Sequence, residues 1–168
     1  QVHQGESIGF VNYVDMPHSP RYCFGYGLSY TDFDYQDLRV RRLDASDSEG
    51  GNEIFMGPED QLQISFTVKN IGGIKGDEVA QLYLSDWFAS RTRPVKELAG
   101  FCRLQLKPGE TQKVIFTVSP SLMAFTDSEM RWKIEKGEFR IGVGSSSEDI
   151  RLKGRYFVTE SAWIEGRN

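Results

Sequence analysis

The chain has 168 residues, of which 39% are hydrophobic and 12% are aromatic, and this is enough for one domain with a single buried core. Its 20 basic and 24 acidic residues give a net charge of −4 and form no basic stripe, so we expect no nucleic-acid partner. No apolar run approaches the roughly 20 residues that a membrane-spanning helix needs, so we expect no membrane partner either.

The first 30 residues have the composition of an arm, not of a core. Glycines, prolines and scattered aromatic residues occur there without an apolar period. We therefore expect residues 1–30 to be an extended arm that packs on something else. Apolar side chains without a partner seek cover, so self-association through this arm, by exchange with a second copy, is a further expectation.

Further along, apolar and polar residues alternate, which is the period of half-buried strands. The clearest alternation is in Leu62, Ile64, Phe66 and Val68, in Ala80, Leu82 and Leu84, in Val114, Phe116 and Val118, in Phe139, Ile141 and Val143, and in Ile150, Leu152, Tyr156 and Val158. Weaker strands are expected over Tyr35–Arg42, Phe101–Leu106 and Met130–Glu135. About seven or eight short strands separated by turn residues predict an all-β fold, an antiparallel β-sandwich.

Three further features of the sequence complete the pattern. Asp44–Asp60 is rich in acidic residues, glycine and serine, so we expect a mobile surface loop there. Ser121–Asp127 follows a proline and is the best helix candidate, with a turn or two at most. Cys23 and Cys102 have no metal-ligand spacing, and we interpret both as free thiols, with a single disulfide as the alternative. The lack of a disulfide framework favours a cytoplasmic location.

The residue pattern predicts no catalytic residue, no metal site and no cofactor. The carboxylates near turns are interpreted as solvated turn and cap residues: Asp32, Asp34, Asp37, Asp86, Asp127 and Glu129. His3 and His18 are the only histidines, and no serine or cysteine stands in a nucleophile motif. Gly142-Val143-Gly144 is too short for a loop that holds phosphate.

The run Phe24, Gly25, Tyr26, Gly27, Leu28, Ser29 and Tyr30, followed by Thr31 and Phe33, resembles the segment that joins the second and third domains of family 3 glycoside hydrolases. We call Phe24–Tyr30 the linker motif. Further similar blocks are Val68–Asn70 with Gly72, Gly76 and Glu78–Tyr83, then Arg93–Leu98 with Gly100 and Phe101, then Leu106–Glu110, and finally Gly137–Phe139, Val143–Ser146 and Asp149–Ile150. The blocks follow one another in the family's order between Gly5 and Val158.

The resemblance implies an immunoglobulin or fibronectin type III-like sandwich over 31–160, preceded over 1–30 by the end of an α/β sandwich domain and its linker, and followed by a tail over 161–168. Family members hydrolyse β-linked glycosides with retention, through two carboxyl groups that precede this region in the usual domain order. The chain would then be a non-catalytic stabiliser of a parent β-glycosidase, with the barrel and the α/β sandwich as its partners. Phe10–Asp15 and Cys23 depart from the family's usual residues, which leaves the sugar open.

One segment supports a rival interpretation. Trp87 and Phe88 follow a strand, and an indole face can stack on a sugar ring. The alternative function is therefore a carbohydrate-binding module for β-linked carbohydrate. Arg91 and Arg93 lie in the same segment, which in the family tends to face neighbouring domains, so interdomain packing is favoured over a lip of the parent active site or an independent sugar site.

Overall fold

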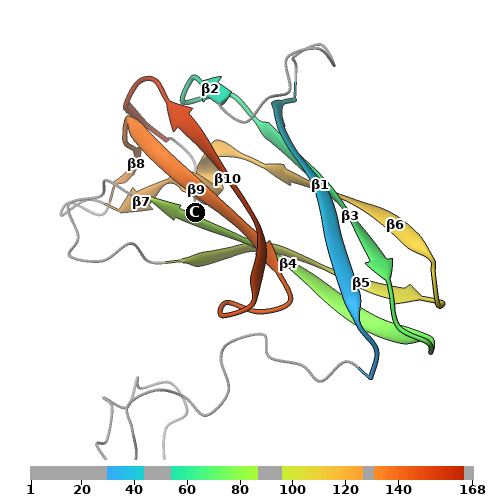
Figure 1. The fold of residues 1–168 in the computed structure, drawn as a ribbon. Helices are drawn as coiled ribbons and strands as arrows, with labels where there is room; N and C mark the ends of the chain where they lie inside the picture. Colours follow the sequence, from blue (N-terminus) through green and yellow to red (C-terminus); the bar gives the residue numbers. More distant parts are fainter. Residues whose placement is uncertain (1–29, 44–53, 87–95, 127–130, 165–168) are drawn as a thin grey trace, which may run out of the picture.

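The computed structural model describes residues 30–43, 54–86, 96–126 and 131–164. Within these ranges the chain forms strands β1 to β11 and one four-residue helix, α1 (Pro120–Met123). The predicted all-β sandwich is confirmed (Figure 1). In this part of the chain no helix has the length and apolar character to cross a bilayer.

Two sheets form the body of the sandwich. The first has the order β1 (Phe33–Arg42), β3 (Leu62–Asn70) and β6 (Thr111–Val118), with antiparallel pairing throughout. The second has the order β2 (Ile54–Met56), β10 (Ile150–Val158), β9 (Gly137–Gly144), β4 (Gly76–Asp86) and β5 (Glu97–Leu106). Its pairs are antiparallel except for β2, which runs parallel to β10.

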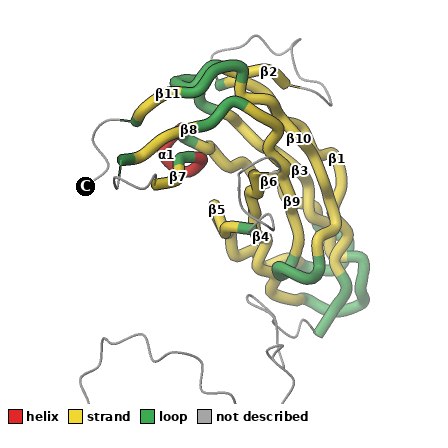
Figure 2. Tube along the Cα trace, turned by 90° about the vertical axis from the view of Figure 1, so that its left-hand side faces the viewer, coloured by secondary structure: helices red, strands yellow, loops and turns green. Residues whose placement is uncertain are grey.

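A third, small sheet lies at one end of the molecule beside α1 (Figure 2). It has the order β11 (Ala162–Trp163), β8 (Trp132–Ile134) and β7 (Phe125–Thr126). The backbone amide of Ile164 donates a 2.9 Å hydrogen bond to the carbonyl of Trp132, and the Ile164 side chain packs against the main core. Residues 162–164 therefore belong to the folded body.

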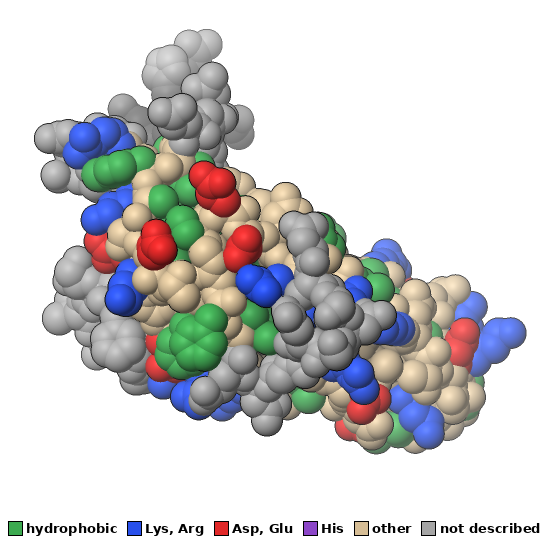
Figure 3. Space-filling model, turned by 90° about the horizontal axis from the view of Figure 1, so that it is seen from above, with side chains coloured by type: hydrophobic (Ala, Val, Ile, Leu, Met, Phe, Trp, Pro, Cys, Tyr) green, Lys and Arg blue, Asp and Glu red, His purple; other side chains and the backbone are tan. Residues whose placement is uncertain are grey.

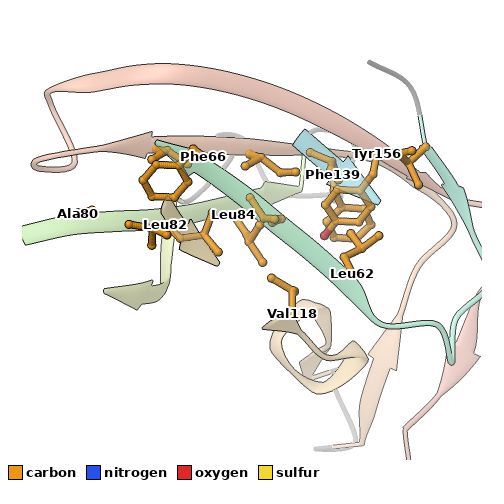
Figure 4. Packing of buried hydrophobic residues seen from close by; sticks show 14 of the residues in the cluster. Leu62, Phe66, Ala80, Leu82, Leu84, Val118, Phe139 and Tyr156 are labelled. Carbon is orange, nitrogen blue, oxygen red and sulfur yellow. The ribbon is translucent and has the colours of Figure 1, made fainter. Parts of the chain in front are cut away.

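The core lies between the two large sheets and is built from the alternating residues (Figure 4). Both inner faces contribute fully buried side chains, and the rings of Phe139 and Tyr156 stack with centroids 5.2 Å apart. Nearly all the alternating residues are buried as predicted, while Phe116, Ile150 and Leu152 are half-buried. Burial of each large apolar side chain contributes roughly 1.5–3 kcal/mol, so this alternation is the main source of stability.

The expectation of a loop over Asp44–Asp60 is wrong for residues 54–56. β2 lies within that stretch, where Ile54 and Met56 are buried and Ile54 pairs with Tyr156 of β10. The amide of Thr159 also donates a 3.0 Å hydrogen bond to the carbonyl of Met56. A three-residue strand is too short to show a period, and its partner is about a hundred residues away. The helix candidate over Ser121–Asp127 begins earlier, and β7 replaces its second half.

Candidate functional site

The residues predicted to carry function lie mostly outside the described ranges. This holds for Phe24–Ser29 of the linker motif and for Trp87, Phe88, Arg91 and Arg93. Tyr30, the last residue of the linker motif, is described and is 89% exposed. The end of the sandwich where the linker motif meets β1 is therefore the candidate functional site.

Asn70 organises this end of the sandwich. It is the last residue of β3 and is fully buried. Its side-chain Nδ2 donates 2.9 Å hydrogen bonds to the carbonyls of Ile74 and Leu106. Its Oδ1 accepts 3.0 Å hydrogen bonds from the hydroxyl of Thr31 and from the amide of Gly72. The four hydrogen bonds satisfy the whole amide group, which is what burial of such a group requires.

The backbone of Asn70 extends the same network to the turn between β5 and β6. Its amide donates to the carbonyl of Glu110 at 2.9 Å, and its carbonyl accepts from the amide of Gly109 at 2.8 Å. Gly109 has a φ of 78°, which favours glycine at this turn position. Asn70 therefore joins the start of β1, the β3–β4 connection and the β5–β6 turn at one end of the sandwich (Figure 1).

Two glycines leave room for the side chain of Thr31. A Cβ at Gly72 would lie 1.9 Å from the Thr31 hydroxyl oxygen, and a Cβ at Gly76 would lie 2.3 Å from the Thr31 methyl carbon. A side chain at either position would require Thr31 to shift. We call Thr31, Asn70, Gly72 and Gly76 the Thr31 anchor. It fixes the point at which the linker motif joins the sandwich.

A second polar contact holds β1 from within the core. The hydroxyl of Tyr35 donates a 3.0 Å hydrogen bond to Oε1 of Glu78, which is buried on β4. Burial, together with the nearby Glu78 carboxylate, raises the pKa of Tyr35 well above its ordinary value. Tyr35 therefore stays protonated and keeps its role as the donor to Glu78.

Arg151 links β10 to the same strand. Its guanidinium donates to the backbone carbonyl of Phe33 and forms a 2.8 Å ion pair with Asp149. It also lies 5.3 Å from the centre of the Tyr35 ring. The hydrogen bond from Arg151 holds the pKa of Asp149 below its ordinary value, and the same hydrogen bond raises the pKa of Arg151. Together with Glu78, Arg151 fastens β1, the strand after the linker motif, to the second sheet.

Only part of this site could be predicted from the sequence. Gly72 and Gly76 lie in a block that resembles the family, and the resemblance implies no role for them. The partner that explains both glycines, Thr31, is 39 residues from Asn70, and no local pattern indicates that the two residues are in contact. The burial of Glu78 had no sequence signal either, because acidic residues are usually exposed.

The two glycines of Gly142-Val143-Gly144 lie close against neighbouring atoms of the chain. A Cβ at Gly144 would lie 1.8 Å from the Asp149 carbonyl oxygen, and a Cβ at Gly142 would crowd Ile150, so these glycines allow close packing of the β9–β10 connection. Among the residues described, no three of His, Cys, Asp and Glu gather as they would around a metal ion. Cys102 is a free, half-buried cysteine, whereas Cys23 lies outside the described residues.

The outer face of the second sheet carries a shallow depression of about 340 Å³. Tyr83, Ser85 and Lys96 line it together with residues of β9 and β10. Ser85 and Lys96 lie on either side of the undescribed segment 87–95 in the chain.

The charged side chains are mixed on the face shown in Figure 3, which views the molecule of Figure 1 from above. Basic and acidic side chains are interspersed there, so this view shows no large area of one charge.

Comparison with known proteins gives a consistent set of relatives. A profile for the "Fibronectin type III-like domain" matches residues 78–147. The chain is 40% identical over 139 residues to a putative β-xylosidase of Formosa agariphila, covering 83% of this chain and 17% of that protein. It is 38% identical over 165 residues to thermostable β-glucosidase B of Acetivibrio thermocellus, covering 98% of this chain and 20% of that protein.

Solved structures agree with the sequence relatives. β-Glucosidase 3B of Thermotoga neapolitana in complex with α-D-glucose matches with a TM-score of 0.72 and 34% identity, over 88% of this chain and 19% of that one. β-Glucosidase of Listeria innocua in complex with glucose matches with a TM-score of 0.71 and 36% identity, over 88% and 19% of the two chains. The chain thus spans about a fifth of the length of these proteins.

Proposed function

This chain belongs to the fibronectin type III-like domains of family 3 β-glucosidases, and from that premise we propose that it is a non-catalytic domain that stabilises a parent β-glycosidase. The parent would hydrolyse β-linked glycosides with retention, through carboxyl groups on its other domains. The α/β sandwich and the barrel of the parent would be the binding partners of this domain.

The Thr31 anchor is the observation that carries this proposal. In this anchor a fully buried asparagine binds Thr31, and two glycines leave the space that the Thr31 side chain occupies. That threonine directly follows the linker motif, so the anchor sets the point at which the linker joins the sandwich. A domain that binds only the folded form of its neighbour stabilises that neighbour by linkage. A fixed linker reduces the conformational entropy that is lost when the two domains bind.

A test compares thermal inactivation of the parent polypeptide with and without an intact anchor. Asn70→Ala should lower the temperature of half-inactivation of β-glycoside hydrolysis while leaving KM unchanged at low temperature. Gly73→Ala is the matched control, because a Cβ there meets nothing within 4 Å. A stabilising role is contradicted if Asn70→Ala unfolds the sandwich while the parent inactivates at an unchanged temperature.

A carbohydrate-binding module is the second candidate, and the depression on the outer sheet face is the observation that favours it. Its lining residues Ser85 and Lys96 flank the segment that contains Trp87 and Phe88. Titration with soluble and insoluble β-glucans and xylans tests this function. Saturable binding that is lost in Trp87→Ala would support the module, and absence of binding would leave the stabilising role alone.

A further inference from the structure

Three exposed apolar side chains belong to residues next to the Thr31 anchor in the chain or hydrogen-bonded to it through their backbone. Tyr30 directly precedes Thr31 and is 89% exposed, while Ile71 and Ile74 in the β3–β4 connection are 59% and 53% exposed. The amide of Ile71 donates a 2.9 Å hydrogen bond to the carbonyl of Asp32, so the connection lies directly against the start of β1. We call Tyr30, Ile71 and Ile74 the linker patch.

Two isoleucines are unusual in this connection. Residues 71–75 read Ile-Gly-Gly-Ile-Lys, and such turns favour small or polar residues that solvate well. One exposed apolar side chain needs no explanation, but two isoleucines in a five-residue connection, beside an exposed tyrosine at the start of β1, are typical of a contact surface. The carbonyl of Ile74 is bound by the side chain of Asn70, so the backbone that presents the patch is fixed in place.

We propose that the linker patch is the surface that docks onto the folded domain preceding residue 30 in the parent polypeptide. This inference rests on the proposed function and names the surface through which it acts. Tyr30, a member of the patch, is also the residue through which the sandwich is connected to the preceding part of the polypeptide. The curated relatives extend well beyond the match, since the chain covers 17% to 20% of their length. A domain tethered at residue 30 therefore meets this end of the sandwich at high effective concentration.

Cysteine accessibility in the parent polypeptide tests the docking directly. Ile74→Cys is compared with Ile115→Cys, both with Cys23→Ser and Cys102→Ser. Ile115 is the matched control, because it is 52% exposed and lies on β6, outside the patch. In this chain alone, a maleimide should label the two cysteines at rates within about threefold of each other. In the parent, position 74 should react at least about tenfold more slowly than position 115.

Equal labelling rates at positions 74 and 115 in the parent would overturn the inference. If Asn70→Ala still lowered the inactivation temperature of that parent, the stabilising role would stand and only the docking surface would be wrong. Ile71→Cys provides a second site in case Ile74→Cys folds poorly. It should show the same protection relative to position 115.

Discussion

The hydroxyl of Thr31 donates a 3.0 Å hydrogen bond to the side-chain oxygen of Asn70, across 39 positions of the chain. This single contact ties the residue after the linker motif to a buried amide that also holds the β3–β4 connection and the end of β5. Together with the polar contacts of Tyr35 and Arg151, it holds β1 in the sandwich.

Asn70→Ala should lower the free energy of unfolding of the chain by about 2–3 kcal/mol, because it removes the donors to the Ile74 and Leu106 carbonyls, the second of which is buried. Urea unfolding followed by tryptophan fluorescence measures the change. Gln112→Ala, at an exposed position of the neighbouring strand, should change the midpoint little. Equal midpoints for the Asn70→Ala chain and the original would show that the amide network adds no stability.

Gly76→Ala should be destabilising by about 1–3 kcal/mol, since the new Cβ meets the Thr31 methyl group at 2.3 Å. Thr31→Ser removes that methyl group and keeps the hydroxyl. The double variant Thr31→Ser with Gly76→Ala should therefore regain much of the lost stability.

The same rescue should fail for Gly72→Ala, because the Cβ there overlaps the Thr31 hydroxyl oxygen at 1.9 Å, and serine retains that oxygen. Double-mutant cycles on melting temperature give both coupling energies. Similar coupling of Thr31→Ser with the two glycine variants would contradict the geometry of the anchor.

Tyr35→Phe should cost about 1–2 kcal/mol near neutral pH, because the buried Glu78 carboxylate loses its hydrogen bond from the phenol. The pKa of Tyr35 is raised in the folded state above its ordinary value of 10.0. The contribution is therefore fully present below that pH and is lost as the pH rises, since the unfolded chain releases the proton first.

The stability difference between the original chain and the Tyr35→Phe variant should then shrink by about 1.4 kcal/mol per pH unit above pH 10. Urea unfolding between about pH 8 and pH 11 measures it. Tyr30→Phe, at an exposed ring, controls for the loss of a phenol. A difference that stays constant across this pH range would contradict the buried donor role of Tyr35.

The strands with regular alternation could be predicted from the sequence because each carries its evidence locally. Leu62, Ile64, Phe66 and Val68 are all buried in β3, as their spacing indicates. β2 could not be predicted, because its three residues are stabilised by parallel pairing with β10, and the surrounding acidic residues favour a loop. Pairing between distant segments has no local signature.

For the candidate site, the sequence indicated the segment of the chain that is involved but not the residues that hold it. The linker motif pointed to residues 24–30, and the structure shows that the residues holding its end are Asn70, Gly72 and Gly76. Their roles depend on where Thr31 lies in the folded chain. Amino-acid composition and hydrophobic periodicity carry no information about that position. The resemblance to a family identified the block that contains Asn70, Gly72 and Gly76, and the contacts with Thr31 explain why these residues occur there.

Deletion of residues 1–29 should leave the sandwich folded, because over the described residues the buried core begins at Phe33 and is closed by strands that all follow it. The melting temperature should change by no more than the few degrees that correspond to about 1 kcal/mol. Deletion of residues 1–31 removes Thr31 as well and should lower the melting temperature further, because the Asn70 oxygen loses one donor. A collapse of the melt on the shorter deletion would show that the arm belongs to the core.

Hydrolysis of aryl β-glycosides by this chain alone and by its parent polypeptide, assayed side by side, tests the central claim most directly. The account predicts turnover by the parent and none by this chain above the buffer rate. Turnover by this chain that survives repurification and scales with its concentration would contradict a non-catalytic role.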